Sequence, residues 1–143
     1  MHDVAAGLTV RTARHSDIPA VLAIWDQARS AAAVTPDDDA AIEWLLERDP
    51  EALLLAELGD RPVGALIAGW DGWRGTMYRL AVLAEHRRHG VASRLVDEGH
   101  RRLAARGARR VTALVAPDEA DAVGLWRAMG YARDDMARYV RGL

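Results

Sequence analysis

The segment Arg87–Ser93 contains the densest group of residues suited to ligand chemistry, and it reads Arg-Arg-His-Gly-Val-Ala-Ser. Its small residues let the backbone approach a ligand closely. We expect a helix to begin near Val91, and the first turn of a helix offers amide groups that favour anions. Arg87 and Arg88 add permanent charge that pairs with phosphate. The pattern predicts a diphosphate-binding loop, and a solvated basic loop with a glycine turn is the alternative.

A second candidate is the segment Gly69–Gly75, in which two tryptophans flank an Asp-Gly pair. Asp-Gly is typical of a tight turn, so Asp71 is either a turn residue or a candidate general base. The turn does not require Trp70 or Trp73, which we expect to form the lip of a substrate pocket or a dimer contact. Arg74 is a candidate to bind a carboxylate of the substrate, or else to pair with Asp71 and stiffen the loop.

Two further aromatic residues each have two interpretations. Tyr78 lies on the strand expected beside the loop and is suited to act as an acid or hydrogen-bond donor, although packing within a sheet explains it equally well. Trp44 is either a core residue of its helix or a wall of the substrate pocket. Trp25 fits the core face of an earlier helix.

The elements that must position these residues follow from the hydrophobic periodicity. The segment Thr35–Asp39 is expected to open the second helix, where the negative charge of its three aspartates is favourable, and Pro50 lies beyond its end. Strands are expected over 8–12, 52–57, 63–68, 76–83, 111–115 and 131–140, and helices over 18–25, 35–49, 91–106 and 120–129. This order predicts a mixed sheet with helices in one domain.

Composition excludes several classes of function. The chain has 143 residues, 50% of them hydrophobic and 28% charged, which is ordinary for a globular protein. Cysteine and lysine are both absent, which excludes a thiolate metal site, a P-loop and a Schiff-base lysine. A net charge of −2 disfavours nucleic-acid binding, and the five histidines show no metal-ligand spacing. With no apolar run long enough for a membrane span and no signal pattern, we expect a cytoplasmic protein.

Four segments resemble the GNAT superfamily of acetyltransferases, in the order in which that family carries them. Arg87-x-x-Gly90-x-Ala92 matches the motif Q/R-x-x-G-x-G/A, and Leu80-Ala81-Val82 resembles the strand before it. The segment Ala122–Tyr131 resembles the family's A-x-x-L-Y-x-x-x-G-F pattern, and Val10–Ile18 resembles its I-R-x-A…D start. The segment Gly69–Gly75 also resembles the G-Y-D-G-x-R-G hairpin of a bacterial YpeA-like subgroup.

The resemblance implies one N-acetyltransferase domain over residues 1–143, with the α/β (α+β) GNAT fold. That fold has a mixed, mostly antiparallel sheet with a splayed parallel pair and helices on both faces. Acetyl-CoA is the implied donor, its pyrophosphate held by the amides of 88–93 and its pantetheine arm between the strands through Val82 and Val115. The residues implied to bind it are Leu80, Ala81, Val82, Arg87, Arg88, His89, Gly90, Val91, Ala92, Ser93 and Trp126.

The chain departs from the family at the positions that transfer protons. Trp126 stands where many relatives carry a tyrosine acid, and an indole N–H donates a hydrogen bond without releasing a proton near neutral pH. Leu114 stands where some peptide-acetylating relatives carry a glutamate base. The catalytic candidates are therefore Trp126, Tyr78 and Asp71, and a water chain is the alternative.

The expected reaction is acetyl transfer to an amine of a small molecule or a protein, by direct attack in a ternary complex. The alternative is a GNAT fold that binds acyl-CoA as a sensor or regulator, because Trp126 and Leu114 replace titratable groups. The residues expected to line the acceptor site are Trp70, Trp73, Arg74 and Trp44. No nucleic acid, membrane or metal is expected as a partner.

Overall fold

The computed structural model describes residues 6–28 and 37–143. They form a five-stranded sheet in the order β1-β2-β3-β4-β5, in which β1 to β4 are antiparallel neighbours and β5 runs parallel to β4. The strands are β1 (Leu8–Thr12), β2 (Leu53–Leu58), β3 (Arg61–Trp70), β4 (Gly75–Val82) and β5 (Val111–Ala113). The mixed, mostly antiparallel sheet that the sequence predicts is confirmed.

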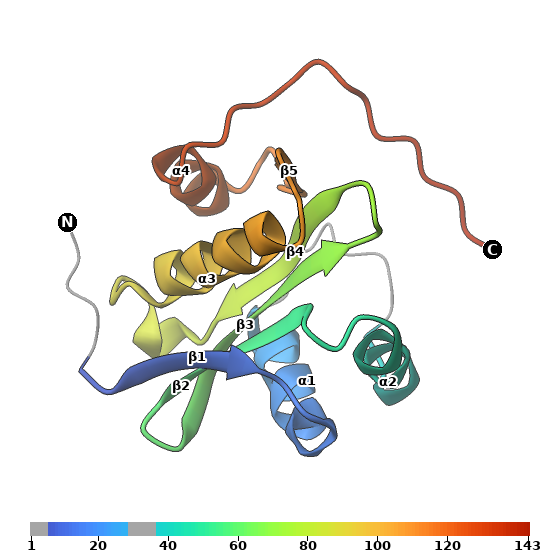
Figure 1. The fold of residues 1–143 in the computed structure, drawn as a ribbon. Coiled ribbons are helices and arrows are strands. Elements are labelled where there is room, and N and C mark those ends of the chain that lie inside the picture. The colour runs from blue at the N-terminus through green and yellow to red at the C-terminus, as the bar shows by residue number, and fades with distance from the viewer. Residues whose placement is uncertain (1–5, 29–36) are drawn as a thin grey trace.

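Helices cover both faces of this sheet. The described residues form α1 (Ile18–Ala28), α2 (Asp39–Arg48), α3 (Val91–Ala105) and α4 (Ala120–Ala128), with short 3₁₀ turns at His15–Asp17 and Ala84–His86. Figure 1 shows α3 across one face of the sheet and α1 behind the other, with α4 beside β5. The order of the elements matches the expected fold as far as α4, and the helices lie on both faces of the sheet as expected.

Each face of the sheet has its own hydrophobic core, because side chains alternate between the faces along a strand. On the α3 side, Leu95, Val96 and Leu103 pack against Leu66 and Met77, with side chains that are at most 1% exposed. The core on the other side joins α1 and α2 to the sheet through Val21, Ile24, Trp25, Ile42, Leu46, Leu53 and Leu55. Trp25 is therefore a core residue, as its helical spacing predicts.

The start of α2 confirms the role expected for the aspartate run. Asp38 is the N-cap, and its carboxylate accepts a hydrogen bond of 2.8 Å from the amide of Ala41. Asp39 lies in the first turn, where the helix dipole favours negative charge. Thr35 and Pro36, which the sequence also assigns to this helix start, lie outside the described residues.

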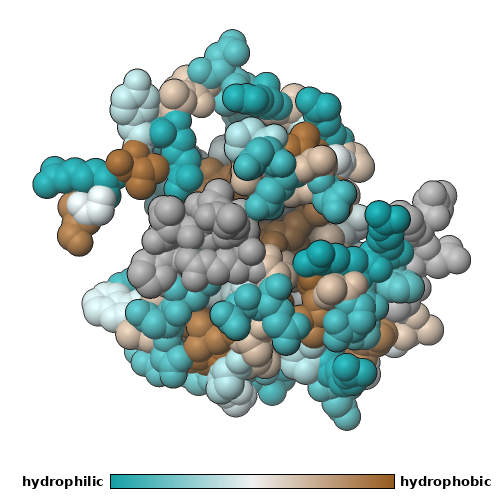
Figure 2. Space-filling view, turned by 180° about the vertical axis from the view of Figure 1, so that it is seen from behind, coloured by the Kyte–Doolittle hydropathy of each residue, from teal (hydrophilic) through white to brown (hydrophobic). Residues whose placement is uncertain are grey.

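The expected final strand over 131–140 is wrong. The chain after Tyr131 forms no helix or strand, and Figures 1 and 2 show it projecting from the body. The carboxylate of Asp134 accepts a hydrogen bond of 3.1 Å from the amide of Met136, which makes a local turn in place of extended backbone. Met136, Tyr139 and Val140 also lack two-residue spacing, and all three are exposed.

No helix in the described parts of the chain is both long and apolar enough to cross a membrane.

Candidate functional site

The parallel strands β4 and β5 pair over a short stretch and then separate. Gly75, Thr76 and Met77 pair with residues 111–113, and the amide of Leu114 donates a last hydrogen bond of 3.1 Å to the carbonyl of Met77. β4 continues to Val82, and no strand among the described residues pairs with this part of its edge. The expected β5 was longer, reaching Val115. The separation leaves backbone groups of β4 open beside β5, as the predicted splay requires.

A bulge in β4 at Arg79 bends the strand at this point. The register between β3 and β4 shifts between Ala65 and Ile67, and Arg79 has a left-handed backbone with φ of 57°. Bulges bend a strand and increase its twist, and they often lie next to active sites. Sequence reasoning missed this bulge, because arginine carries no signal for positive φ.

Contacts from the α1 side hold the bulge. The indole Nε1 of Trp25 donates a hydrogen bond of 3.0 Å to the carbonyl of Arg79. The guanidinium of Arg79 lies 2.9 Å from the carboxylate of Asp37, and both side chains are less than one fifth exposed. The strained backbone is therefore fixed on both its carbonyl and its side chain.

The loop after β4 leads into an uncapped helix. Arg88 and Gly90 both have left-handed backbones, with φ of 65° and 80°. Gly90 is the N-cap of α3 and its carbonyl accepts from the amide of Arg94, but no side chain caps the first turn. Alternation of left-handed and right-handed residues turns successive amides into one concavity that binds anions. The loop thus offers an anion-binding cradle at the end of β4.

The side chains around this cradle divide into structural and exposed groups. The guanidinium Nε of Arg87 donates a hydrogen bond of 3.2 Å to the carbonyl of Val82, which ties the loop to β4. Val91 is buried in the α3 core, so only its amide faces the loop. Arg88 and His89 are exposed. The ring Nε2 of His86 is buried, and no described residue forms a hydrogen bond with it.

The remaining cofactor candidates lie on the adjoining elements. Leu80 and Val82 pack toward α3, whereas Ala81 packs toward α1. Ala92 and Ser93 are half-buried in the first turn of α3. The structure therefore brings the predicted segments 80–82 and 87–93 together at one end of the splay.

Trp126 lies on α4 in a cluster that the sequence only partly predicts. It is 5% exposed, and its ring meets that of Tyr131 edge to face at a centroid distance of 4.8 Å. The Tyr131 hydroxyl lies 2.7 Å from the Nε2 atom of His100 and 3.7 Å from the sulfur of Met77. Sequence reasoning missed His100 and Tyr131 as a pair, because 31 positions separate them.

The other two catalytic candidates differ in their surroundings. The pKa of Tyr78 is raised by burial and by the charge of Asp49, so its hydroxyl stays protonated and is suited to donate hydrogen bonds. Asp71 accepts hydrogen bonds from the amides of Arg74 and Trp73, at 2.6 Å and 2.8 Å, and these lower its pKa. This engagement favours the turn role for Asp71 over the general-base role.

The four acceptor candidates do not form one cluster. Trp70 packs toward α3, and its amide donates to the carboxylate of Asp49 at 3.1 Å. Trp44 is 57% exposed on α2, with the guanidinium of Arg48 stacked 3.3 Å above its ring. Trp73 is 84% exposed at the hairpin tip. Arg74 is exposed beside it, and its side chain forms no ion pair with Asp71 in the described region.

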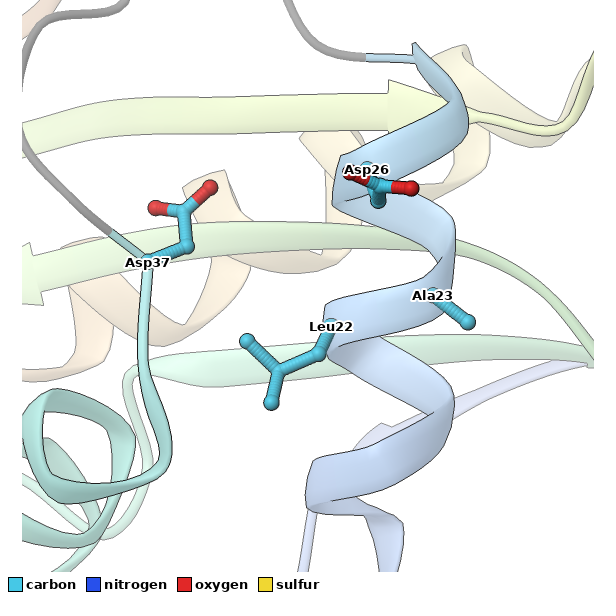
Figure 3. A pocket seen from close by; sticks show the side chains of 4 residues that line it. All are labelled: Leu22, Ala23, Asp26 and Asp37. Carbon is cyan, nitrogen blue, oxygen red and sulfur yellow. The ribbon is translucent and has the colours of Figure 1, made fainter.

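A shallow pocket lies on the opposite face of the sheet from α3. It is lined by Leu22, Ala23 and Asp26 of α1 and by Asp37, which precedes α2. Figure 3 shows the two carboxylates on separate segments, with Leu22 between α1 and Asp37. Because Asp37 also pairs with Arg79, this pocket adjoins the bulge of β4.

The sequence and the fold match known proteins. Residues 18–131 match the Acetyltransferase (GNAT) family. The chain is 30% identical over 128 residues to an acetyltransferase of Pectobacterium atrosepticum, covering 90% of each protein. It is 29% identical to an acetyltransferase of Sodalis glossinidius, covering 90% of this chain and 89% of that one.

Solved structures agree on the fold. Ard1 from Thermoplasma volcanium aligns with a TM-score of 0.77 at 21% identity, over 89% of this chain and 84% of that chain. AAC(6′)-Iy, solved with the bisubstrate analogue CoA-S-monomethyl-acetylneamine, aligns with a TM-score of 0.77 at 19% identity, over 95% and 98%. At these identities the structural likeness supports the fold alone, and the family match supplies the assignment. The protein is an acetyltransferase and belongs to the GNAT family.

Proposed function

We propose that this protein transfers an acetyl group from acetyl-CoA to an amine of a small molecule or a protein, by direct attack in a ternary complex. The observation that carries the proposal is the uncapped first turn of α3, with left-handed Gly90 before it, at the end of the separated strand β4. This cradle would take the diphosphate of CoA, and the open edge of β4 would take the pantetheine arm.

The residues present fit that ligand. An anion at the start of α3 receives amide hydrogen bonds and the favourable helix dipole. Arg88 is exposed beside the cradle and adds charge, whereas Arg87 is committed to the carbonyl of Val82. The family to which the chain belongs uses acetyl-CoA as its donor substrate.

The reaction requires a neutral amine, a polarised carbonyl and stabilisation of a thiolate. The open backbone groups of 80–82 are suited to hold and orient the thioester. Among the candidates for a general base in the described residues, Asp71 is occupied, because its carboxylate accepts a hydrogen bond from the amide of Arg74 in the turn. We therefore propose that the acceptor amine loses its proton to solvent.

Measurement of CoA release with a panel of amines tests this function. The panel contains polyamines, amino acids, aminoglycosides and peptides with free N-termini, each at several concentrations. Turnover with at least one amine class, with acetyl-CoA saturating independently of the amine, supports the proposal.

Tight acetyl-CoA binding by calorimetry without turnover on any amine would favour the sensor alternative. That alternative is motivated by Trp126 and Leu114 in place of titratable groups. Absence of both binding and turnover would overturn the assignment of the cradle itself.

A further inference from the structure

The bulge at Arg79 changes which edge of β4 each backbone group faces. Before the bulge, the carbonyl of Met77 points to β5, where it accepts from the amide of Leu114. Beyond the bulge, the amide of Leu83 donates a hydrogen bond of 2.9 Å to the carbonyl of Val63 in β3. Backbone groups alternate in direction along a regular strand, so without an extra residue Leu83 would face the same edge as Met77. The bulge has therefore exchanged the two edges.

This exchange places the backbone groups of Leu80 and Val82 on the open edge of β4 and those of Ala81 toward β3. The register agrees, because Ala81 pairs with Ala65 of β3. The side chains agree as well, since Leu80 and Val82 pack toward α3 and Ala81 packs toward α1. A shift by one residue would turn all of these groups the other way. The edge that we propose for the thioester therefore depends on the bulge.

Trp25 satisfies the carbonyl that the bulge leaves outside the ladder. A bulge leaves its extra residue unpaired, and a buried backbone carbonyl needs a partner. The indole Nε1–H of Trp25 donates a hydrogen bond of 3.0 Å to the carbonyl of Arg79. An indole nitrogen only donates, so the direction of this bond is fixed. Trp25 is 4% exposed, which holds its ring in place within the α1 core.

The side chain of Arg79 is held on the same face of the sheet. Its guanidinium lies 2.9 Å from the carboxylate of Asp37 and 6.0 Å from the centroid of the Trp25 ring. Arginine does not favour the left-handed backbone that Arg79 adopts, so surrounding contacts must impose it. The ion pair is largely buried and is therefore weakly screened. Trp25 and Asp37 thus hold residue 79 at both its carbonyl and its charge.

We propose that Trp25 and Asp37 are positioning residues for acetyl transfer, which act through Arg79 to keep the backbone groups of 80–82 directed at the splay. This inference rests on the proposed function, which places the thioester along that edge. Both side chains reach Arg79 from the α1 side of the sheet, so their effect on the reaction is indirect.

Hydrogen exchange of single amides in the free protein tests the register without turnover. The amide of Ala81 lies in the ladder with β3 and should exchange slowly, whereas that of Leu80 faces the open edge and should exchange faster. Trp25→Phe keeps an aromatic ring but removes the N–H, and it should lower the protection of Ala81 about 10-fold, the factor for one lost hydrogen bond to a buried carbonyl. Val21→Ala removes volume from the same core and is the matched control, with unchanged protection of Ala81.

Turnover should follow the register. We expect Trp25→Phe to lower kcat at least about 10-fold, because misplacement of a reacting group by ~1 Å can cost about 100-fold. Val21→Ala should keep the wild-type kcat. Affinity of Trp25→Phe for CoA, measured by calorimetry, should fall by a smaller factor than kcat, since the cradle proposed for the diphosphate lies beyond the bulge.

Substitutions at Arg79 separate the role of its backbone from that of its guanidinium. Glycine adopts positive φ without steric cost and alanine does not, although both remove the ion pair with Asp37. We therefore expect Arg79→Gly to keep a higher kcat than Arg79→Ala. Trp25→Phe and Asp37→Ala should each cost less in the Arg79→Gly background than in the wild-type protein, because that backbone no longer has to be imposed.

Wild-type kcat and wild-type exchange rates in Trp25→Phe would overturn this inference and leave the proposed function standing. Equal losses in Arg79→Gly and Arg79→Ala would assign the effect to the guanidinium and also overturn it. A loss in Val21→Ala as large as that in Trp25→Phe would show a general effect of core stability and overturn it as well. Absence of wild-type turnover with every amine would overturn the proposed function, and this inference with it.

Discussion

Gly90→Val is the substitution that tests the cradle most directly. Gly90 has φ of 80° and ψ of 7°, a left-handed conformation that costs an L-residue about 1–2 kcal/mol. The new side chain would also project from the loop that we propose as the diphosphate site. The variant should therefore lose both stability and affinity for CoA.

The backbone cost can be separated from the loss of binding by a matched control. Gly59 has φ of 63° in the turn between β2 and β3, and an added Cβ there meets no atom within 4 Å. Gly59→Val should suffer the same backbone penalty away from the cradle. For a chain of this size, each kcal/mol lost lowers the melting temperature by roughly 3–5 °C. Both variants should show such a shift.

Only the Gly90 variant should bind CoA more weakly. A lost charge-assisted contact together with a steric clash costs at least ~2 kcal/mol. That free energy raises the dissociation constant about 30-fold. Calorimetry well below either melting temperature measures it. Unchanged affinity in Gly90→Val, or an equal loss in Gly59→Val, would refute the placement of the diphosphate at the start of α3.

Three further substitutions test the rest of the site and the scaffold. Trp126→Phe should keep most of the turnover, because the buried indole packs against Tyr131 as a wall; a fall of about 100-fold would make Trp126 the thiolate donor. Arg74→Ala should raise the acceptor KM and leave the acetyl-CoA KM nearly unchanged, since its side chain is exposed; equal damage to both constants would make the hairpin a scaffold. Hydrogen bonds from Arg11 lower the pKa of Asp17 below its usual 3.8, so its stabilising effect is complete above that value and is lost as pH falls through the lowered pKa. Urea unfolding should therefore show wild type more stable than Asp17→Asn at pH 7, with the difference shrinking below pH ~4; a constant difference would contradict this pairing.

Elements with strong periodicity were predictable from the sequence. In α3, Leu95, Val96, Gly99 and Leu103 recur at helical spacing, and all four are buried in the structure. The turn glycines likewise mark the hairpins, because Gly59 and Gly72 both adopt positive φ, which glycine tolerates without steric cost. The residue type itself carries the structural information at these positions.

The backbone of the cradle was predictable for the same reason, but the cluster around Tyr131 was not. The sequence shows a glycine at position 90, just before the expected start of a helix. The segment 87–93 forms the loop and first turn of α3, as that glycine predicts. The line from His100 through Tyr131 to Met77 joins three elements that are distant in the chain. Their contact depends on the packing of α3 and α4 on the sheet, which local patterns do not encode.

The positive φ angles of Arg79 and Arg88 could not be predicted from the sequence either, and they affect the shape of the site. Both residues hold left-handed backbones that cost an ordinary L-residue roughly 1–3 kcal/mol each, so the surrounding structure must impose them. At Arg79 the imposing contacts are the Trp25 hydrogen bond and the Asp37 ion pair, both from the α1 side. The bulge of β4 is therefore held by contacts from the α1 face, whereas the cradle and Tyr131 belong to the α3 face. A ligand in the splay would lie between these two sets of contacts, which gives each face of the sheet a distinct part in shaping one site.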